Sequence, residues 1–221
     1  YEQYFQSAPE PPEERRQERK EYGDALQLFV ALLGQQSDAR IGTYLKKWQE
    51  FQGAEGTDET DRQGRYLQAK ITLDSQENAK DNDKPVDRKA VETVIEELGN
   101  LKYGNDLIAA LSYVQRVRAH VLLDNYKKAL DLIDKSKSYL AQFDKALRKA
   151  GRKSDSPLVG LFYYWGIALK QKAIAANRSG DGVEAKQYLL SALKRCRKVT
   201  VEYPDADVYP AKATVEFETI K

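Results

Sequence analysis

The chain has 221 residues, enough for one large domain or for a run of stacked repeats with a buried core. Its 36 Lys and Arg residues are balanced by 34 Asp and Glu residues, a balance that argues against a dedicated nucleic-acid-binding protein. One cysteine and one histidine leave no basis for a disulfide framework or for most metal and acid–base sites, and no run of about 18 apolar residues predicts a membrane span.

The N-terminal segment 1–12 is rich in proline and is expected to be an arm or linker. From Glu13 onward, apolar residues recur every three or four positions, which predicts amphipathic helices. Polar stretches at 34–38, 53–61 and 74–87 are expected to be loops. We expect nine helices in pairs, covering about 13–33, 41–51, 66–73, 90–98, 105–123, 126–150, 157–178, 182–202 and 207 to the chain end.

Local signals mark several helix ends. Ser156 followed by Pro157 predicts a cap and the first helical position of the seventh helix. Asp181 with Glu184 is an acidic variant of the capping box and predicts the start of the eighth. Gly151, which follows several basic residues, predicts the end of the sixth.

Two segments of the second half share a pattern. In 119–129 and 175–185 an alanine near the end of one helix is followed by a polar turn and by a second alanine ten positions later. Small side chains at these positions allow the two helices of a hairpin to cross closely. The pattern resembles the tetratricopeptide repeat, most clearly over 180–185 followed by Tyr188, Ala192 and Leu193.

This resemblance implies an all-α, right-handed α-solenoid of antiparallel helix hairpins. It implies one repeat domain over 13–221, with irregular hairpins over 13–104 and better-matching repeats over 105–213. Ala90, Ala129 and Ala185 would anchor three copies, but they are spaced by 39 and 56 residues, against a family period of about 34. Because the helical pattern still runs at Lys221, we expect that further repeats follow or that another chain caps the stack.

A second cue concerns location. The stretch from Tyr203-Pro204 to Tyr209-Pro210 is similar to a junction between repeats in tetratricopeptide proteins of the bacterial cell envelope. The bacterial periplasm or cell envelope and the cytoplasm are both open as compartments.

Members of this family use the concave face, formed by the first helices of the hairpins, to bind peptides or partner proteins. The resemblance therefore predicts a non-enzymatic interaction scaffold, with a protein or peptide partner, no nucleic acid, no catalytic residue, no metal and no cofactor. Arg118, Lys170 and Arg178 would bind carboxylates of an acidic peptide; the competing interpretation is that they are solvated charges. The expected partner-binding residues are Gln115, Arg118, Lys170, Gln171, Asn177 and Arg178, beside the inner-face positions Val114, Val121, Leu122 and Ile174.

Other prominent features have ordinary structural explanations. The basic runs 145–153 and 186–198 lie in later turns of helices, where cations are favoured, and lack the aromatic interleaving of a nucleic-acid surface. The aromatic run 162–165 is expected to pack in the core. His120 is expected to be structural and Cys196 a buried small apolar residue.

Two alternatives remain open. A helical-toroid enzyme acting on carbohydrate would show a closed pocket with two acids about 5–10 Å apart. A regulatory domain would hold a small ligand between repeats, in a pocket lined by the tyrosine-rich helices. A scaffold instead predicts an open groove with mixed basic and aromatic lining.

Overall fold

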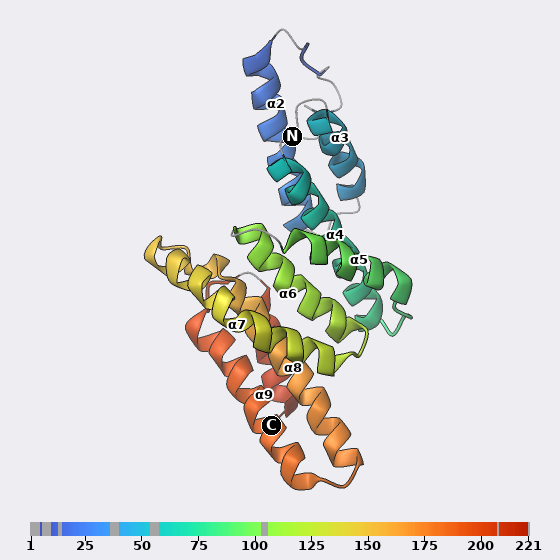
Figure 1. The fold of residues 1–221 in the computed structure, drawn as a ribbon, viewed down its shortest axis with the longest axis vertical. Coiled ribbons are helices and arrows are strands. Elements are labelled where there is room, and N and C mark those ends of the chain that lie inside the picture. The colour runs from blue at the N-terminus through green and yellow to red at the C-terminus, as the bar shows by residue number, and fades with distance from the viewer. Residues whose placement is uncertain are drawn as a thin grey trace. The chain divides into compact units, whose positions relative to one another are not determined.

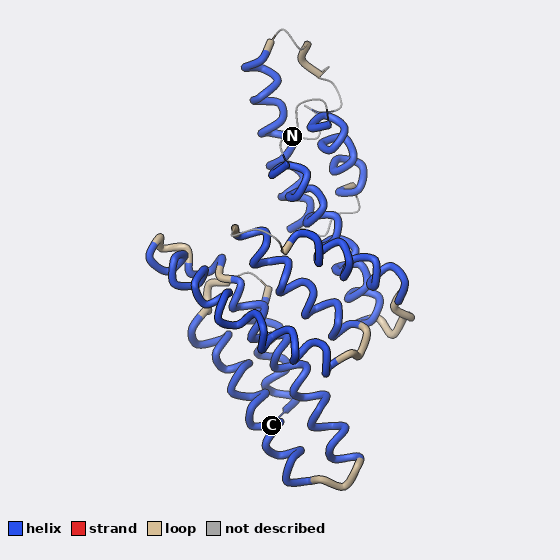
Figure 2. The backbone as a smooth tube through the Cα atoms, in the orientation of Figure 1, coloured by secondary structure: helices blue, strands red, loops and turns tan. Residues whose placement is uncertain are grey.

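The computed structural model describes Phe5 and residues 10–12, 15–35, 40–53, 58–102, 106–206 and 208–220, and every regular element among them is helical (Figure 1, Figure 2). The all-α prediction is confirmed, and each expected helix has a counterpart. The described α-helices are α2 (Arg16–Gln35), α3 (Ile41–Gly53), α4 (Asp58–Asp81), α5 (Arg88–Leu101), α6 (Leu107–Leu122), α7 (Tyr126–Lys149), α8 (Pro157–Arg178), α9 (Gly182–Glu202) and α10 (Tyr209–Ile220). A 3-10 turn, η1 (Lys153–Asp155), precedes α8.

The helix α4 is much longer than its apolar stripe predicts. The loop expected over 74–87 is wrong in its first half, because α4 continues to Asp81. The extra turns are polar but contain good helix formers, and the Lys70–Asp74 pair at 3.1 Å supports them from one turn earlier. The helix ends where Asp83 adopts a positive φ of 54° and the Lys84 amide donates to the Ala79 carbonyl.

The chain divides into two compact units, 1–74 and 75–221, and the division falls within α4. The better-matching repeat segment 105–213 lies wholly in the second unit. The single domain expected over 13–221 stays a prediction, and each unit is described below by itself.

The first unit has an aromatic core built by α2, α3 and the start of α4. Phe5, from the segment expected to be an arm, is only 3% exposed, and its ring lies 5.4 Å from that of Tyr22 and 5.6 Å from that of Phe29. Arg19 is buried as well: its guanidinium lies 4.8 Å above the Phe51 ring and donates to the Pro11 carbonyl at 2.8 Å. These contacts hold Phe5 and Pro11 on the helical hairpin.

The second unit is organised around α8. Helices that are consecutive in sequence pack on each other from α5 to α10, and α8 also contacts α6 and α10. Most of the residues of α8 are buried, including all but one of the aromatic run 162–165, which confirms that this run belongs to the core. A helix that is apolar on all sides needs neighbours on all sides.

Two glycines let α8 approach its neighbours closely. A Cβ at Gly160 would lie 2.8 Å from Cγ1 of Val114 on α6, and a Cβ at Gly166 would lie 2.9 Å from Sγ of Cys196 on α9. Real Cβ atoms do not tolerate such distances, so both crossings depend on glycine.

The predicted helix ends in this unit are confirmed. The Ser156 hydroxyl accepts from the Leu158 amide, with Pro157 at the first helical position, and the Asp181 carboxylate accepts from the Glu184 amide at 2.9 Å. Gly151, after α7, has the positive φ of 70° that a left-handed C-terminal position requires.

Candidate functional site

A groove of about 340 Å³, partly open to solvent, lies in the second unit beside α8. We call it the Tyr163 groove. The end of α4, the end of α6, the start of α7, the middle of α8 and α10 contribute its walls. Its lining residues are Glu77, Lys80, Asp81, Val121, Leu122, Asp124, Tyr126, Tyr163, Tyr164, Ile167, Gln171 and Glu216.

Glu77 is the most heavily bonded acid of the groove. Its Oε2 accepts from Nη2 of Arg118 at 2.7 Å and from Nζ of Lys212 at 2.8 Å, and its Oε1 accepts from the Tyr164 hydroxyl at 3.4 Å. One carboxylate on α4 therefore joins α6, α8 and α10. The two bonds from cations are charge-assisted, and they fix the position of this carboxylate.

A second ion pair lies at the C-terminal end of α6. Lys80 donates to Oδ1 of Asp124 at 2.7 Å and to the Leu122 carbonyl at 3.1 Å, and the Tyr126 hydroxyl donates to the same Asp124 oxygen at 2.5 Å. Burial acts to raise the pKa of Asp124, but the hydrogen bonds from Lys80 and Tyr126 outweigh it, and the pKa lies below its usual value. Asp124 has a positive φ of 59°, which places its carboxylate in the turn between α6 and α7.

The third acid, Glu216 on α10, accepts from Nζ of Lys170 at 2.7 Å. Lys170 also donates to the Thr219 hydroxyl at 3.0 Å. Three of the four groove carboxylates thus have a basic side chain of this chain as a partner. The fourth, Asp81, has no hydrogen-bond or ion-pair partner among the described residues.

Two other polar groups of the groove lack an intramolecular partner among the described residues, the Tyr163 hydroxyl and the Gln171 side-chain amide. Tyr163 is 7% exposed, and its ring packs against Tyr164 at 5.0 Å and Tyr209 at 5.6 Å. Burial raises the pKa of Tyr163 well above its usual value, and the groove carboxylates act in the same direction. The hydroxyl therefore stays protonated at neutral pH.

The residues expected to bind a partner are distributed unevenly around the groove. Gln171 lines it, together with the inner-face residues Val121 and Leu122. Gln115 and Arg118 are 4% and 3% exposed, and the Gln115 carbonyl oxygen accepts from the Arg118 guanidinium at 3.3 Å. Arg118 thus lies behind the groove wall as a counter-ion for Glu77.

The remaining three predicted residues have separate environments. Lys170 is the partner of Glu216 at the groove edge. Asn177 and Arg178 are exposed at the end of α8 and are not part of the lining. Arg118 and Lys170 were expected to bind carboxylates of a partner, but within the chain they pair with Glu77 and Glu216. Binding of a partner by these residues stays a prediction.

The sequence analysis missed the acids of the groove. Glu77, Lys80 and Asp81 fall in a segment expected to be a loop, whereas in the helix their spacing of three and four residues places them on one face. Glu216 is separated from Lys170 by 46 positions, a pairing that no local pattern reveals. The one local signal is the polar turn Asp124-Asn125-Tyr126 within the segment 119–129.

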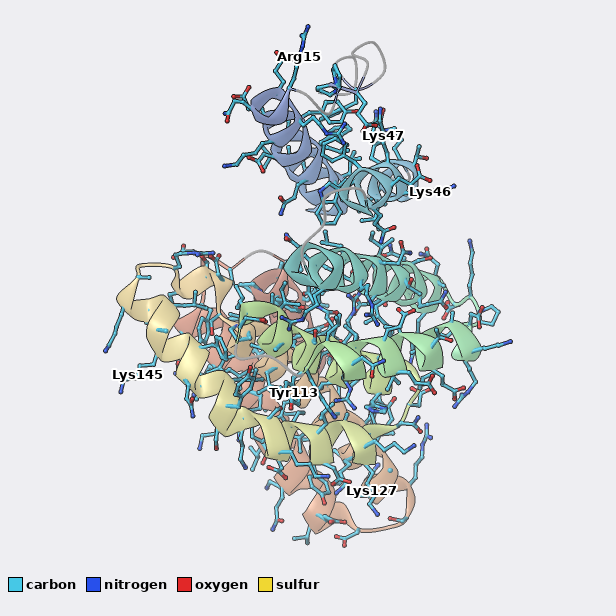
Figure 3. The ribbon with its side chains drawn as sticks, turned by 45° about the horizontal axis from the view of Figure 1, so that its top comes forward. Arg15, Lys46, Lys47, Tyr113, Lys127 and Lys145 are labelled. Carbon is cyan, nitrogen blue, oxygen red and sulfur yellow. The ribbon has the colours of Figure 1, made fainter. Side chains whose placement is uncertain are left out.

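Part of each basic run is engaged within the chain. Arg148 contacts Asp144 at 2.6 Å, and Arg195 lies 3.6 Å from the centre of the Trp165 ring. Other basic residues of α7, such as Lys127 and Lys145, are exposed and project from the ribbon (Figure 3).

Asp144 anchors a second polar cluster, which is buried. Its Oδ1 accepts from the Ser156 hydroxyl at 2.7 Å and from the Tyr203 hydroxyl at 2.9 Å, and its Oδ2 accepts from Arg148. These bonds outweigh the effect of burial and lower the pKa of Asp144. Every oxygen is used by the chain, so the cluster joins α7, α8 and α9 and has no group left for a ligand.

The single histidine and the single cysteine have structural environments. Burial lowers the pKa of His120 to about 4, and Arg116 and Lys128 add to this effect. Cys196 is fully buried, and burial raises the pKa of its thiol to about 11, which keeps the thiol protonated and unreactive. Both observations agree with the roles expected for these residues.

The described ranges contain no cluster of three or more His, Cys, Asp or Glu side chains suited to a metal ion. None of the described helices is both long enough and apolar enough to cross a bilayer.

The described part of the chain is all-helical, and in the second unit the helices from α5 to α10 pack in sequence order, with a polar and aromatic groove beside α8. Comparison with protein-family models, with curated proteins and with solved structures found no match.

Proposed function

We propose that the protein is a non-enzymatic interaction scaffold that binds an extended segment of a partner protein in the Tyr163 groove. The carrying observation is the composition of this groove: apolar side chains line it together with polar groups that have no partner within the described chain. Binding sites commonly combine an apolar surface with a few placed polar groups. A groove that is partly open suits a chain segment that enters and leaves it better than it suits an enclosed small molecule.

The helix packing supports the proposed α-solenoid. In a stack of helical hairpins, the first helix of each hairpin packs on its own second helix and on the first helix of the next hairpin. The contacts of α8 with α9, with α6 and with α10 follow this scheme. If α6, α8 and α10 are first helices, the residues Val121, Gln171 and Glu216 lie on the concave face, and the groove is the binding surface that the tetratricopeptide resemblance implies.

The carbohydrate-enzyme alternative is less well supported. A glycoside hydrolase needs a carboxylic acid that holds its proton near neutral pH, beside a second acid. Of the four groove acids, Glu77, Asp124 and Glu216 each form an ion pair with a Lys or Arg of the chain, so these carboxylates are already engaged. Such paired carboxylates suit a structural or binding role.

Peptide selection tests the proposal. A random peptide library displayed on phage is selected against the full chain, and the affinities of enriched peptides are measured by fluorescence anisotropy. Gln171→Trp places a large side chain in the groove and is expected to weaken these peptides about tenfold or more. The matched control is Gln187→Trp, at an exposed position of α9 outside the groove, and it should leave affinity unchanged.

The result has two readings. Enriched peptides that are sensitive to Gln171→Trp and insensitive to Gln187→Trp support binding in the groove. Peptides that bind both variants and the unmodified chain equally well would show that the groove is not the binding surface. Circular dichroism of both variants confirms that the helical fold is intact.

A further inference from the structure

The groove favours one charge of ligand. Four acids line it, Glu77, Asp81, Asp124 and Glu216, against a single basic lining residue, Lys80. The cations that neutralise Glu77 and Glu216 belong to residues outside the lining. Most of the charged side chains that a ligand in the groove would contact are therefore carboxylates.

Within the chain, these carboxylates form hydrogen bonds mainly with basic side chains. Each of the three paired acids accepts a charge-assisted hydrogen bond of 2.7 Å from a Lys or Arg nitrogen. The Leu122 carbonyl at the end of α6, where the helix dipole is negative, also accepts from a lysine. Only Asp81 of the four acids lacks such a cation among the described residues.

The Tyr163 hydroxyl is the second group that a ligand would find. It has no hydrogen-bond partner among the described residues, its side chain is 7% exposed, and it lines the groove. A hydroxyl at the surface of a groove is available to a hydrogen-bonding group of a ligand. Because the pKa of Tyr163 is raised, the neutral phenol is present, and its lone pairs accept a hydrogen bond from a cationic N–H.

We infer that the Tyr163 groove recognises a basic side chain, lysine or arginine, of the partner segment, through the carboxylate of Asp81 and the hydroxyl of Tyr163. The Gln171 amide, which also has no partner in the part of the chain that the structure describes, lies in the same groove and suits the peptide backbone next to that side chain. The aliphatic part of a lysine or arginine packs on apolar surface, and Val121, Leu122 and Ile167 provide it. This inference rests on the proposed function and reverses the charge expected of the partner from the sequence.

The test uses the heptapeptide acetyl-Ala-Ser-Ala-Lys-Ala-Ser-Ala-amide and its three analogues with Arg, Gln or Glu at the central position. Each is titrated into the full ¹⁵N-labelled chain, and amide chemical shifts give both the affinity and the location. We expect the Lys and Arg peptides to shift amides around Tyr163 and Gln171, and the Gln peptide to bind at least about fivefold more weakly. Added salt should weaken the Lys and Arg peptides.

Two variants remove the proposed contacts. Asp81→Asn removes the unpaired charge and is expected to weaken the Lys peptide about two- to fivefold, as suits a partly exposed ion pair. Tyr163→Phe removes only the hydroxyl and should also weaken it. The control Asp131→Asn neutralises an exposed aspartate of α7 outside the groove and should leave the affinity unchanged.

The outcomes separate the two proposals. If the Gln or Glu peptide binds the groove as tightly as the Lys peptide, or if Asp131→Asn weakens binding as much as Asp81→Asn, recognition of a basic side chain is overturned while peptide binding in the groove stands. If no peptide shifts the groove amides and the selected phage peptides ignore Gln171→Trp, both proposals are overturned.

Discussion

Arg118 on α6 and Glu77 on α4 form an ion pair with a distance of 2.7 Å between Nη2 and Oε2, and only 4% of the Arg118 side chain is exposed. The pair is part of a larger junction, because Lys212 and Tyr164 bond the same carboxylate. A residue that looked available for a partner is therefore a fixed part of the wall that shapes the groove.

Removal of the Arg118 charge should destabilise the second unit strongly. Arg118→Met leaves the partly buried Glu77 with Lys212 as its only cation, and we expect a loss of about 3 kcal/mol in the free energy of unfolding. Urea denaturation followed by circular dichroism measures it. Arg152→Met removes an exposed pair with Asp155 and should change stability little. Equal effects of the two substitutions would contradict a structural role for the Arg118–Glu77 pair.

One methyl group added where α8 crosses α9 should lower the stability of the fold. Gly166→Ala places a Cβ against Cys196, and this overpacking should destabilise the fold by about 1–3 kcal/mol. The higher helix propensity of alanine offsets up to about 1 kcal/mol of that loss. Gly99→Ala in α5 meets open space and should stabilise by about 0.5–1 kcal/mol. Thermal unfolding compares both.

A double substitution identifies the cause of the Gly166 effect. Cys196→Ala removes the sulfur that the new methyl group would meet, so Gly166→Ala should cost less in the Cys196→Ala background than in the unmodified chain. An unchanged cost would place the clash elsewhere in the crossing.

The helices could be predicted because their signals are local. Periodic apolar residues predict each amphipathic helix, and caps such as Ser156 and Asp181 fix the helix starts, because the cap and its amide lie within three residues of each other. The end of α4 could not be predicted in this way. It has no apolar stripe, and its helical state depends on polar contacts with distant segments, such as Glu77 with Arg118.

The groove could not be predicted from local sequence patterns, because it also depends on contacts between distant segments. Its ion pairs join positions 41 to 135 residues apart, and each basic residue could have paired with several acids or with water. Gln171, Val121 and Leu122, which the sequence predicts on an inner helix face, do line the groove, because helical periodicity groups residues on one face. It assigned the wrong environment to Arg118, because periodicity does not say which acid lies opposite.

The buried Asp144 cluster predicts a pH-dependent contribution. Tyr203→Phe removes one hydrogen bond to a charged carboxylate, and we expect a loss of about 1.5–3 kcal/mol near neutral pH. Because the pKa of Asp144 is lowered in the folded state, its bonds stabilise the protein above the unfolded-state pKa and are lost as pH falls below it. The effect of Tyr203→Phe should therefore shrink in acid.

The matched control for this prediction is Tyr188→Phe. Tyr188 also donates to a carboxylate, Glu184 at 2.7 Å, and its hydroxyl accepts from Lys172 at 2.9 Å, but this site is only half-buried. Its removal should cost less than that of the Tyr203 hydroxyl. Denaturant midpoints for both variants at about pH 7 and about pH 3 give the comparison.

His120 should control stability in mildly acidic solution. Its pKa is lowered from 6.5 to about 4 by burial, so the unfolded chain binds a proton at a higher pH than the folded chain does. Stability is therefore complete above the unfolded-state pKa and falls as the pH is lowered from about 6.5 toward 4, before most carboxylates are protonated. His120→Gln should flatten this part of the curve, because His120 is the only histidine in the chain. Urea midpoints at about pH 7.5, 6 and 5 measure it. An equally steep fall in His120→Gln would assign the effect to other groups.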